Sequence, residues 1–327
     1  MDDGLPTIDD VVDAARRIRG HAVLTPLLRS DALDDLSGGR ILLKVEALQR
    51  TGTFKFRGAF NRISRLDEGE IARGVLAWSS GNHAQGVAAA AALVGAPATI
   101  VMPSDAPVPK IDNTRALGAE IVFYDRYAES REAIGTAIAL EHGATIVPPY
   151  DDARIIAGQG TVGLEAAAQA AALGLTPDHA LSPCGGGGLI AGSALALENH
   201  CPGISIHPVE PAGLDDTARS LGAGERVGNA PEARSICDAL LAPEPGELTF
   251  ALNRRLLSDG IVVNDVEALS AVAWAYRNLR VVVEPGGAVA LAAVLRGHFD
   301  CRNKTVLVIV SGGNIAPDLF IRALSDG

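Results

Sequence analysis

A single lysine lies between two phenylalanines in the stretch from Thr51 to Ala59. Lys55 follows a Thr-Gly-Thr turn and precedes a segment, Gly58 to Leu66, with the pattern of a helix. Apolar neighbours that draw an ammonium group out of water lower its pKa, which makes the neutral, nucleophilic amine accessible. The stretch therefore predicts a lysine that forms a Schiff base. The same pattern is also typical of a surface lysine whose stem lies over the two rings.

Four consecutive glycines, Gly185 to Gly188, follow a predicted strand and precede a predicted helix that begins at Leu189. Without side chains, the N–H groups at a helix start can approach an anion closely, and the helix dipole favours negative charge there. The glycines therefore predict a phosphate-binding loop. They also match part of a dinucleotide fingerprint, Gly186-x-Gly188-x-x-Ala191, with Glu210 placed as a ribose-binding carboxylate would be. A nicotinamide-dependent dehydrogenase is thus an alternative.

Two further loops carry small polar residues after predicted strands. Ser79 to His83 lies at the start of a predicted helix, where its donors could bind a substrate carboxylate or simply cap the helix. Ser311 to Asn314 follows the last predicted strand, at the end where parallel sheets open on their crevice. Ser311 could bond a ligand there, or the stretch could be an ordinary turn.

Composition limits the class of protein. The chain has 327 residues, 48% of them hydrophobic and 4% aromatic, which favours aliphatic packing in one large or two smaller domains. The net charge of −11 argues against a nucleic-acid partner. The acidic start does not resemble a signal peptide, and the apolar runs are too short for a membrane span. Four scattered cysteines indicate reduced thiols. We therefore expect a cytoplasmic protein that acts on small molecules without a membrane.

Strands and helices alternate in two sets, which predicts parallel βαβ units. The first set runs from a strand at Val75 to Trp78 to a strand at Thr145 to Val147, and Pro148 and Pro149 then mark a boundary. The second set begins with a helix at Gly158 to Ala172 and ends with a strand at Thr305 to Val310, interrupted by a long irregular section after residue 209. Two α/β sheets with a cleft between them are expected.

Together, the Lys55 stretch and the three loops resemble, in order and separation, the fold type II pyridoxal-phosphate enzymes. Within these they are similar to the threonine/serine dehydratase and serine racemase family. The stretches Ile156 to Thr161 and Val283 to Ala288 are also family-like. The resemblance implies a two-domain α/β fold with open parallel sheets, similar to the β subunit of tryptophan synthase. Residues 1–72 and 151–327 would form a large cofactor-binding domain, and residues 73–150 a small domain that closes over the substrate.

The resemblance implies a role for each candidate residue. Lys55 would carry pyridoxal 5′-phosphate as a Schiff base and move the Cα proton. Phe54 would flank the pyridine ring, Asn82 would bond its 3-hydroxyl and Ser311 its nitrogen. The other cofactor contacts would come from Gly185, Gly186, Gly187, Gly188 and Glu284, and the substrate contacts from Ser79, Ser80, Asn82, His83 and Arg131.

A serine at the ring nitrogen cannot keep the ring as a stable pyridinium, which weakens the electron sink. This favours loss of a β-hydroxyl, and the expected reaction converts L-threonine or L-serine to 2-oxobutyrate or pyruvate and ammonia. A racemase of serine or aspartate, with Ser80 as the second acid/base, stays open. So does a 3-hydroxyaspartate dehydratase, with Arg131 binding the second carboxylate, although Arg131 could equally be a charge on an exposed helix.

The segment from Glu210 to Asp216 resembles the family's divalent-cation loop. The carboxylates of Glu210 and Asp216 and the carbonyl of Leu214 are hard oxygen ligands that suit Mg²⁺ or Ca²⁺. A solvated acidic loop is the other interpretation. The family resemblance also implies a homodimer.

Overall fold

A computed structural model describes residues 4–79, 81–106, 108–125 and 127–326. The larger of its two sheets has six strands, and only its first edge pair is antiparallel. In spatial order these strands are β1 (Leu27–Leu28), β2 (Arg40–Val45), β10 (Thr305–Val310), β7 (His179–Pro183), β8 (Ser205–Pro211) and β9 (Ile261–Val263). The first and last parts of the chain therefore meet in the middle of one sheet.

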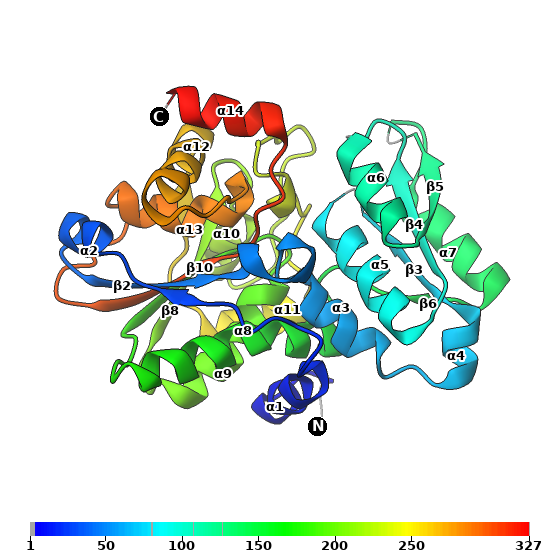
Figure 1. Ribbon diagram of the computed structural model, residues 1–327, viewed down its shortest axis with the longest axis horizontal. Helices are drawn as coiled ribbons and strands as arrows, with labels where there is room; N and C mark the ends of the chain where they lie inside the picture. The colour runs from blue at the N-terminus through cyan, green and yellow to red at the C-terminus, as the bar shows by residue number, and fades with distance from the viewer. Residues whose placement is uncertain (1–3, 80, 107, 126, 327) are drawn as a thin grey trace.

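The smaller sheet has four parallel strands, all from the part of the chain between β2 and β7. In spatial order they are β5 (Glu120–Tyr124), β4 (Ala98–Pro103), β3 (Val75–Trp78) and β6 (Thr145–Ile146). The chain thus passes from one sheet to the other twice, and the two sheets with their helices lie side by side (Figure 1). The expected α/β architecture is confirmed, whereas the domain limits near residues 73 and 150 stay a prediction.

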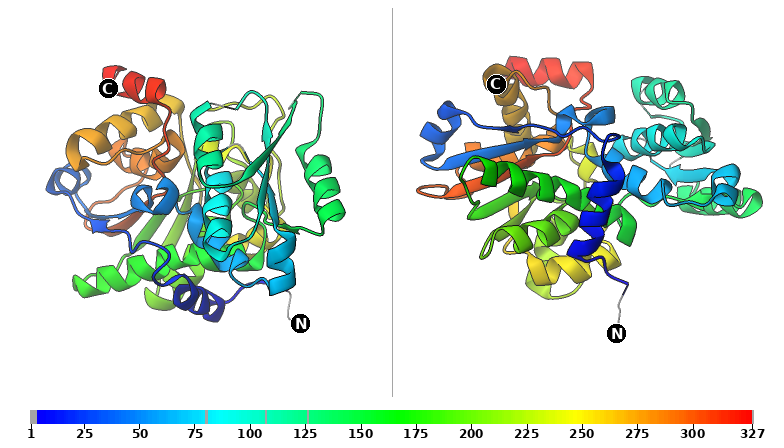
Figure 2. Two further views of the ribbon diagram at one scale, coloured as in Figure 1. Left: turned by 45° about the vertical axis from the view of Figure 1, so that its right-hand side comes forward. Right: turned by 60° about the horizontal axis from the view of Figure 1, so that its bottom comes forward.

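Alternating side chains of the large sheet pack into two separate cores, as the two-residue period of a strand requires. Ile41, Leu43 and Val45 face the helices α12 (Asp265–Trp274) and α13 (Pro285–Leu295). Leu42 faces the opposite helices, which include α8 (Ala153–Ala172) and α9 (Gly188–His200). Figure 2 shows these helical layers from two further directions.

Helices also cover both faces of the small sheet. The helix α5 (Asn82–Val94) packs on one face with α3 (Lys55–Ile63), and α7 (Arg131–His142) packs on the other. The remaining α-helices are α1 (Ile8–Ile18), α2 (Asp31–Ser37), α4 (Glu68–Arg73), α6 (Val108–Ala116), α10 (Asp216–Ala223), α11 (Glu247–Leu256) and α14 (Pro317–Asp326). Short turns of other helix types are η1 (Glu46–Leu48), η2 (Arg50–Gly52), η3 (Asp238–Leu240) and η4 (Ala275–Leu279).

Three expectations about the elements are wrong. The helix expected from Gly58 already begins at Lys55, and the helix expected from Gly158 begins at Ala153, because the Asp152 carboxylate accepts two N–H groups there. The section after residue 209 is not irregular throughout, since it contains α10 and α11. The first turn of α11 donates three N–H groups to Asp151, about a hundred residues earlier, which a local pattern cannot reveal.

All four cysteines are buried and unpaired, as expected. Among the described residues, no helix combines the length and the apolar character needed to cross a membrane.

Candidate active site

Lys55 is the first residue of α3 and lies where the chain crosses between the two sheets. Its Nζ donates a hydrogen bond of 2.7 Å to the carbonyl of Pro149, on the returning crossing, and lies 5.2 Å from the centre of the Phe54 ring. Burial lowers the pKa of Lys55 to about 8, and the Glu284 carboxylate opposes part of this shift. The neutral, nucleophilic amine is therefore accessible near neutral pH.

A cleft of about 690 Å³ opens in front of Lys55. It collects loops from the carboxyl ends of strands in both sheets, where ligands of open α/β sheets bind. The sequence-predicted residues that line it are Phe54, Lys55, Ser79, Asn82, His83, Arg131, Gly185, Gly186, Gly187, Gly188 and Ser311. Ser80 lies outside the described residues. The cleft therefore brings together most of the predicted cofactor and substrate contacts.

Asn82 connects the small sheet's helices to the large sheet's loops. Its Nδ2 donates to Glu284 Oε1 at 2.7 Å, and its Oδ1 accepts from Asn314 Nδ2 at 2.9 Å. Glu284 is buried beside the cleft, and burial raises its pKa to about 7, assisted by the charge of Asp238. The side chain of Asn82 is thereby held in one orientation. Asn314 belongs to a stretch singled out in the sequence, but no role was predicted for it.

His83 is neutral. Its Nε2 lies 2.8 Å from the carbonyl of Val147, so Nε2 carries the proton and donates, and its buried Nδ1 has no partner. Burial lowers the pKa of His83 to about 3, and the nearby Lys55 ammonium lowers it further. His83 therefore offers no positive charge to a substrate carboxylate. The positive charge at this place is the partial charge of the start of α5.

The tetraglycine loop joins β7 to the start of α9. Gly187 has φ 91°, which favours glycine, and a Cβ there would lie 2.7 Å from Nδ2 of Asn253. Both amide atoms of Asn253 are buried without a hydrogen-bond partner. The ring of Tyr150 packs against Gly186. This loop provides N–H groups, a helix start and an unsatisfied amide in one place, as an anion site requires. Neither Asn253 nor Tyr150 was predicted from sequence.

Several charged residues lie around the cleft lining. Arg131 donates to Glu132 from Nε at 2.7 Å, which fits the interpretation as a helix-surface charge, yet its side chain also lines the cleft. Burial opposes its charge, but the bond to Glu132 raises the pKa of Arg131, so it stays a cation. Lys110 of α6 forms an ion pair with Asp238 of η3, which connects the two sides of the cleft.

Residues 18–312 match the family described as "Pyridoxal-phosphate dependent enzyme". The chain belongs to this family. The match decides between the two cofactor classes left open by the tetraglycine loop, and the cofactor is pyridoxal phosphate rather than a nicotinamide dinucleotide.

Relatives of this pyridoxal-phosphate enzyme span nearly its whole length. L-threo-3-hydroxyaspartate ammonia-lyase of Saccharomyces cerevisiae is 42% identical over 312 residues, covering 95% of this chain and 94% of the yeast protein. L-threonine ammonia-lyase of Thermotoga maritima is 39% identical over 325 residues, covering 98% of this chain and 79% of that protein. The solved structure of maize serine racemase has a TM-score of 0.91 and 38% identity, covering 98% and 97% of the two chains.

The residues of the cleft fit pyridoxal phosphate. The half-buried amine of Lys55, with its pKa lowered to about 8, suits condensation with an aldehyde, and the tetraglycine loop with the Asn253 amide could hold a phosphate. Ser311 lines the cleft directly after β10, and Phe54 N–H donates to the Ser311 carbonyl at 3.2 Å. Residues from the two crossings and from the large sheet would therefore hold the cofactor.

The predicted cation ligands of the enzyme lie outside the cleft lining. Glu210 and Asp216 are fully buried, and Glu210 accepts N–H groups of Thr217 and Ala218 at 2.9 and 2.8 Å. Asp216 Oδ1 accepts from Asn229, while its buried Oδ2 has no partner. Burial raises the pKa of Glu210 to about 8, with the charge of Asp216 adding to it. A solvated acidic loop is therefore excluded, and the pair suits a cation.

Among the described residues, no group of three or more acidic, histidine or cysteine side chains could surround one ion. A cation at Glu210 and Asp216 would therefore need the Leu214 carbonyl and waters as further ligands, which Mg²⁺ and Ca²⁺ accept.

Without divalent cations, the melting temperature of the enzyme is expected to fall by several degrees between about pH 4 and pH 8, which are the ordinary and the raised pKa limits of these carboxyls. The folded protein binds protons at Glu210 and Asp216 more tightly than the unfolded chain does, since burial raises their pKa values to about 8 and 6. The stability that these protons provide is present at low pH and is lost as the pH rises through those values. Mg²⁺ or Ca²⁺ should replace the protons and restore stability most at alkaline pH.

Thermal unfolding followed across this pH range, with chelator and with added cation, measures the effect. Asp216→Asn is the matched control, because it keeps the side-chain size and should weaken both the pH dependence and the response to cations. Equal melting temperatures with chelator and with cation at every pH would reject a cation at this pair.

Proposed function

We propose that this enzyme removes ammonia from a β-hydroxy amino acid, with one water lost in the elimination and one taken up in the hydrolysis that follows, leaving a 2-oxo acid. The observation that carries the proposal is the half-buried Lys55 amine, with its pKa lowered to about 8, in a cleft that also contains a phosphate-type loop. Relatives at 39–42% identity that are named ammonia-lyases support it. L-threonine and L-serine are the proposed substrates. They differ by one methyl group, which changes binding by only about 1–3 kcal/mol.

Each side of the cleft has a proposed task. Bound pyridoxal phosphate supplies an electron sink for negative charge at the substrate Cα. Lys55 would hold the cofactor through Nζ, and the same Nζ would take the Cα proton of the substrate. The tetraglycine loop and Asn253 hold the phosphate, and Asn82, fixed by Glu284 and Asn314, orients the ring hydroxyl.

The substrate carboxylate binds at the start of α5, with Ser79, Asn82 and His83 around it. Because His83 is neutral, it contributes hydrogen bonding and shape rather than charge. Ser311 would offer a hydroxyl to the ring nitrogen, which would favour departure of the β-hydroxyl over long-lived charge at Cα. The hydroxyl leaves as water, and a water then releases ammonia, so the products are one 2-oxo acid and one ammonia.

A second candidate substrate is 3-hydroxyaspartate. Arg131 supports it, because this cation lines the cleft and could bind a second carboxylate. The yeast relative named for that substrate is 42% identical. Arg131 begins α7 beside the small sheet, so it would reach the substrate when residues 73–150 close over the cleft, as we propose they do.

The test uses the purified protein with added pyridoxal phosphate and three substrates: L-threonine, L-serine and L-threo-3-hydroxyaspartate. We expect equal amounts of 2-oxo acid and ammonia from at least one of them. Chiral analysis of the remaining amino acid measures racemisation, since serine racemases are also relatives. Absence of ammonia from all three would reject the lyase, and enantiomer formation faster than ammonia release would identify a racemase.

A homodimer and a cytoplasmic location are proposed with the lyase function. The homodimer is proposed from the family resemblance. The cytoplasmic location agrees with the four unpaired cysteines, which are typical of a reducing compartment. Light scattering of the purified protein measures its oligomeric state.

A further inference from the structure

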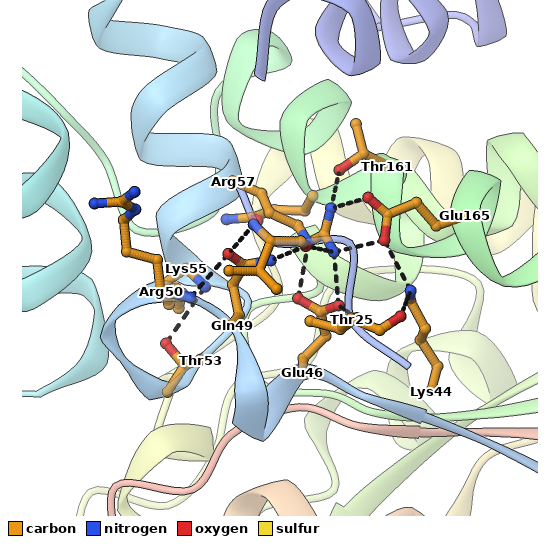
Figure 3. Close-up of polar contacts among 12 residues, drawn as sticks. Thr25, Lys44, Glu46, Gln49, Arg50, Thr53, Lys55, Arg57, Thr161 and Glu165 are labelled. Atoms are coloured by element: carbon orange, nitrogen blue, oxygen red, sulfur yellow. Dashed lines mark hydrogen bonds and ion pairs between the residues drawn. The ribbon is translucent and has the colours of Figure 1, made fainter. Parts of the chain in front are cut away.

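Four charged side chains form a buried cluster next to α3, here called the charge network: Lys44, Glu46, Arg57 and Glu165 (Figure 3). They come from β2, η1, α3 and α8, so the network joins four separate elements. Lys44, Glu46 and Arg57 are fully buried, and only the Glu165 side chain is 19% exposed. Two positive and two negative charges make the network neutral as a whole.

Arg57 is at the centre of the charge network and binds both carboxylates with two hydrogen bonds each. Its Nε and Nη2 donate to Glu46 at 2.7 and 2.8 Å, and its Nη1 and Nη2 donate to Glu165 at 2.7 and 2.8 Å. Nη1 also donates to Thr161 at 3.2 Å. Only a guanidinium has donors arranged to bind two carboxylates in this way. Burial opposes its charge, but both carboxylates raise the pKa of Arg57 above its usual value.

Lys44 occupies the other end of the charge network and is not bonded to α3. Its Nζ donates to the Thr25 carbonyl, to Glu165 and to Gln169 at 2.8, 2.7 and 3.0 Å. Burial lowers the pKa of Lys44, although Glu165 and Glu46 oppose this. The network thus contains two buried cations of which only one, Arg57, belongs to the helix that begins with Lys55.

Lys55 and Arg57 are two residues apart in α3, which places them about 200° apart around the helix axis. Lys55 lines the cleft, whereas Arg57 points to the opposite side, into the charge network. The two pairs of hydrogen bonds, from Arg57 to the carboxylates of Glu46 and Glu165, fix the rotation of the first turn of α3 about its axis. The backbone of the next residue is fixed as well, because Gly58 N–H donates to Gln159 at 3.1 Å. Any rotation of this turn would move the Lys55 amine along the cleft.

Buried charges contribute little to stability compared with apolar residues of similar volume, although removal of one partner is destabilising. Their presence here therefore points to geometry rather than to stability. We propose that Arg57 is a positioning residue, which holds the first turn of α3 so that Lys55 Nζ meets the cofactor and the Cα proton. This inference rests on the proposed role of Lys55.

The decisive comparison is between Arg57→Lys and Lys44→Met. Arg57→Lys keeps the charge, but an ammonium group cannot form two hydrogen bonds with each of two carboxylates. The first turn of α3 should therefore lose its fixed rotation. Lys44→Met removes a buried cation from the same network and leaves the bonds between Arg57 and the two carboxylates in place. A displacement of about 1 Å at a reacting group can slow a reaction by about 100-fold, and this is the loss of kcat expected for Arg57→Lys.

Three readouts separate positioning from a general loss of stability. Both variants are expected to melt at lower temperature than the wild type. Arg57→Lys alone should lower kcat about 100-fold at nearly unchanged KM, and should slow the capture of added pyridoxal phosphate by the apoprotein, followed by visible absorbance and by borohydride trapping. Lys44→Met should keep both rates within about twofold of the wild type.

Equal losses of kcat and of capture rate in the two variants would overturn the inference, because the network would then act only through stability. If Arg57→Lys does not fold, Glu46→Gln replaces it in the same comparison, since it weakens one of the two pairs of hydrogen bonds while keeping the side-chain shape. A wild-type protein that never acquires visible absorbance would overturn the proposed function itself, and is distinguished from the other outcomes by that result.

Discussion

Replacement of Lys55 by alanine is expected to remove both the visible absorbance of the bound cofactor and the ammonia-lyase activity. The amine proposed to attach the cofactor is also the proposed carrier of the Cα proton, so turnover should fall on the order of 10⁴-fold or more. The measurement is an absorption spectrum of the protein with pyridoxal phosphate, before and after borohydride, together with ammonia release.

The apoprotein of this variant should fold normally. Burial lowers the pKa of Lys55 from its ordinary value of 10.5 to about 8, so below about pH 8 the charged lysine costs the folded state stability, and this cost disappears above its unfolded pKa. Its removal therefore does not weaken the fold through charge. Lys110→Ala is the matched control, because Lys110 also lines the cleft. Only Lys44, Lys55, Lys110 and Lys304 are lysines in this sequence, so peptide mapping identifies the reduced site without ambiguity.

An unchanged absorbance and activity in Lys55→Ala would reject the lysine assignment and with it the proposed mechanism. The same two losses in Lys110→Ala would show that the cleft as a whole, and not one amine, is responsible.

Replacement of Arg131 by glutamine is expected to change the choice of substrate. If 3-hydroxyaspartate is a substrate, its second carboxylate should lose a charged partner, which costs about 2–5 kcal/mol or roughly 30- to 4000-fold in kcat/KM. Threonine has no second carboxylate, so its kcat/KM should change only a few-fold. The measurement is kcat/KM for both substrates in the wild type and the variant.

Arg226→Gln is the control for this change. Arg226 also lines the cleft, but it is bonded to Glu244 and to the Pro245 carbonyl. We expect it to affect both substrates alike. If Arg131→Gln also lowered kcat/KM for both substrates by the same factor, Arg131 would have a structural role through its bond to Glu132. A wild type that releases no ammonia from 3-hydroxyaspartate would exclude the second candidate.

Local sequence patterns were sufficient for most of the fold. The strand from Thr305 to Val310 is a run of apolar, mostly β-branched residues, and the structure contains it with the same limits. The motifs of the site were also recognisable, because Lys55, the tetraglycine loop and Ser311 each lie in a short stretch with unusual composition. These segments lie at the ends of strands, where the chain itself places them around one cleft.

Contacts between distant residues could not be predicted in this way. Arg57 and Glu165 are 108 positions apart, and nothing in either local pattern indicates that they meet. The same holds for Asn253, which lies in a stretch expected to be irregular and reaches the tetraglycine loop only through the packing of α11. The start of α3 was misplaced for a related reason, since Phe54 N–H bonds to Ser311, far along the chain.

The position of β10 between β2 and β7 has a consequence for biosynthesis. The four strands of the small sheet come from one continuous segment, so this part can fold while later residues are still being translated. The large sheet cannot, because β2 has no inner neighbour until Thr305–Val310 has left the ribosome. Ser311 and its hydrogen bond to Phe54 arrive with that last strand. A nascent chain therefore cannot complete the proposed site for its vitamin-derived cofactor before this strand has been made.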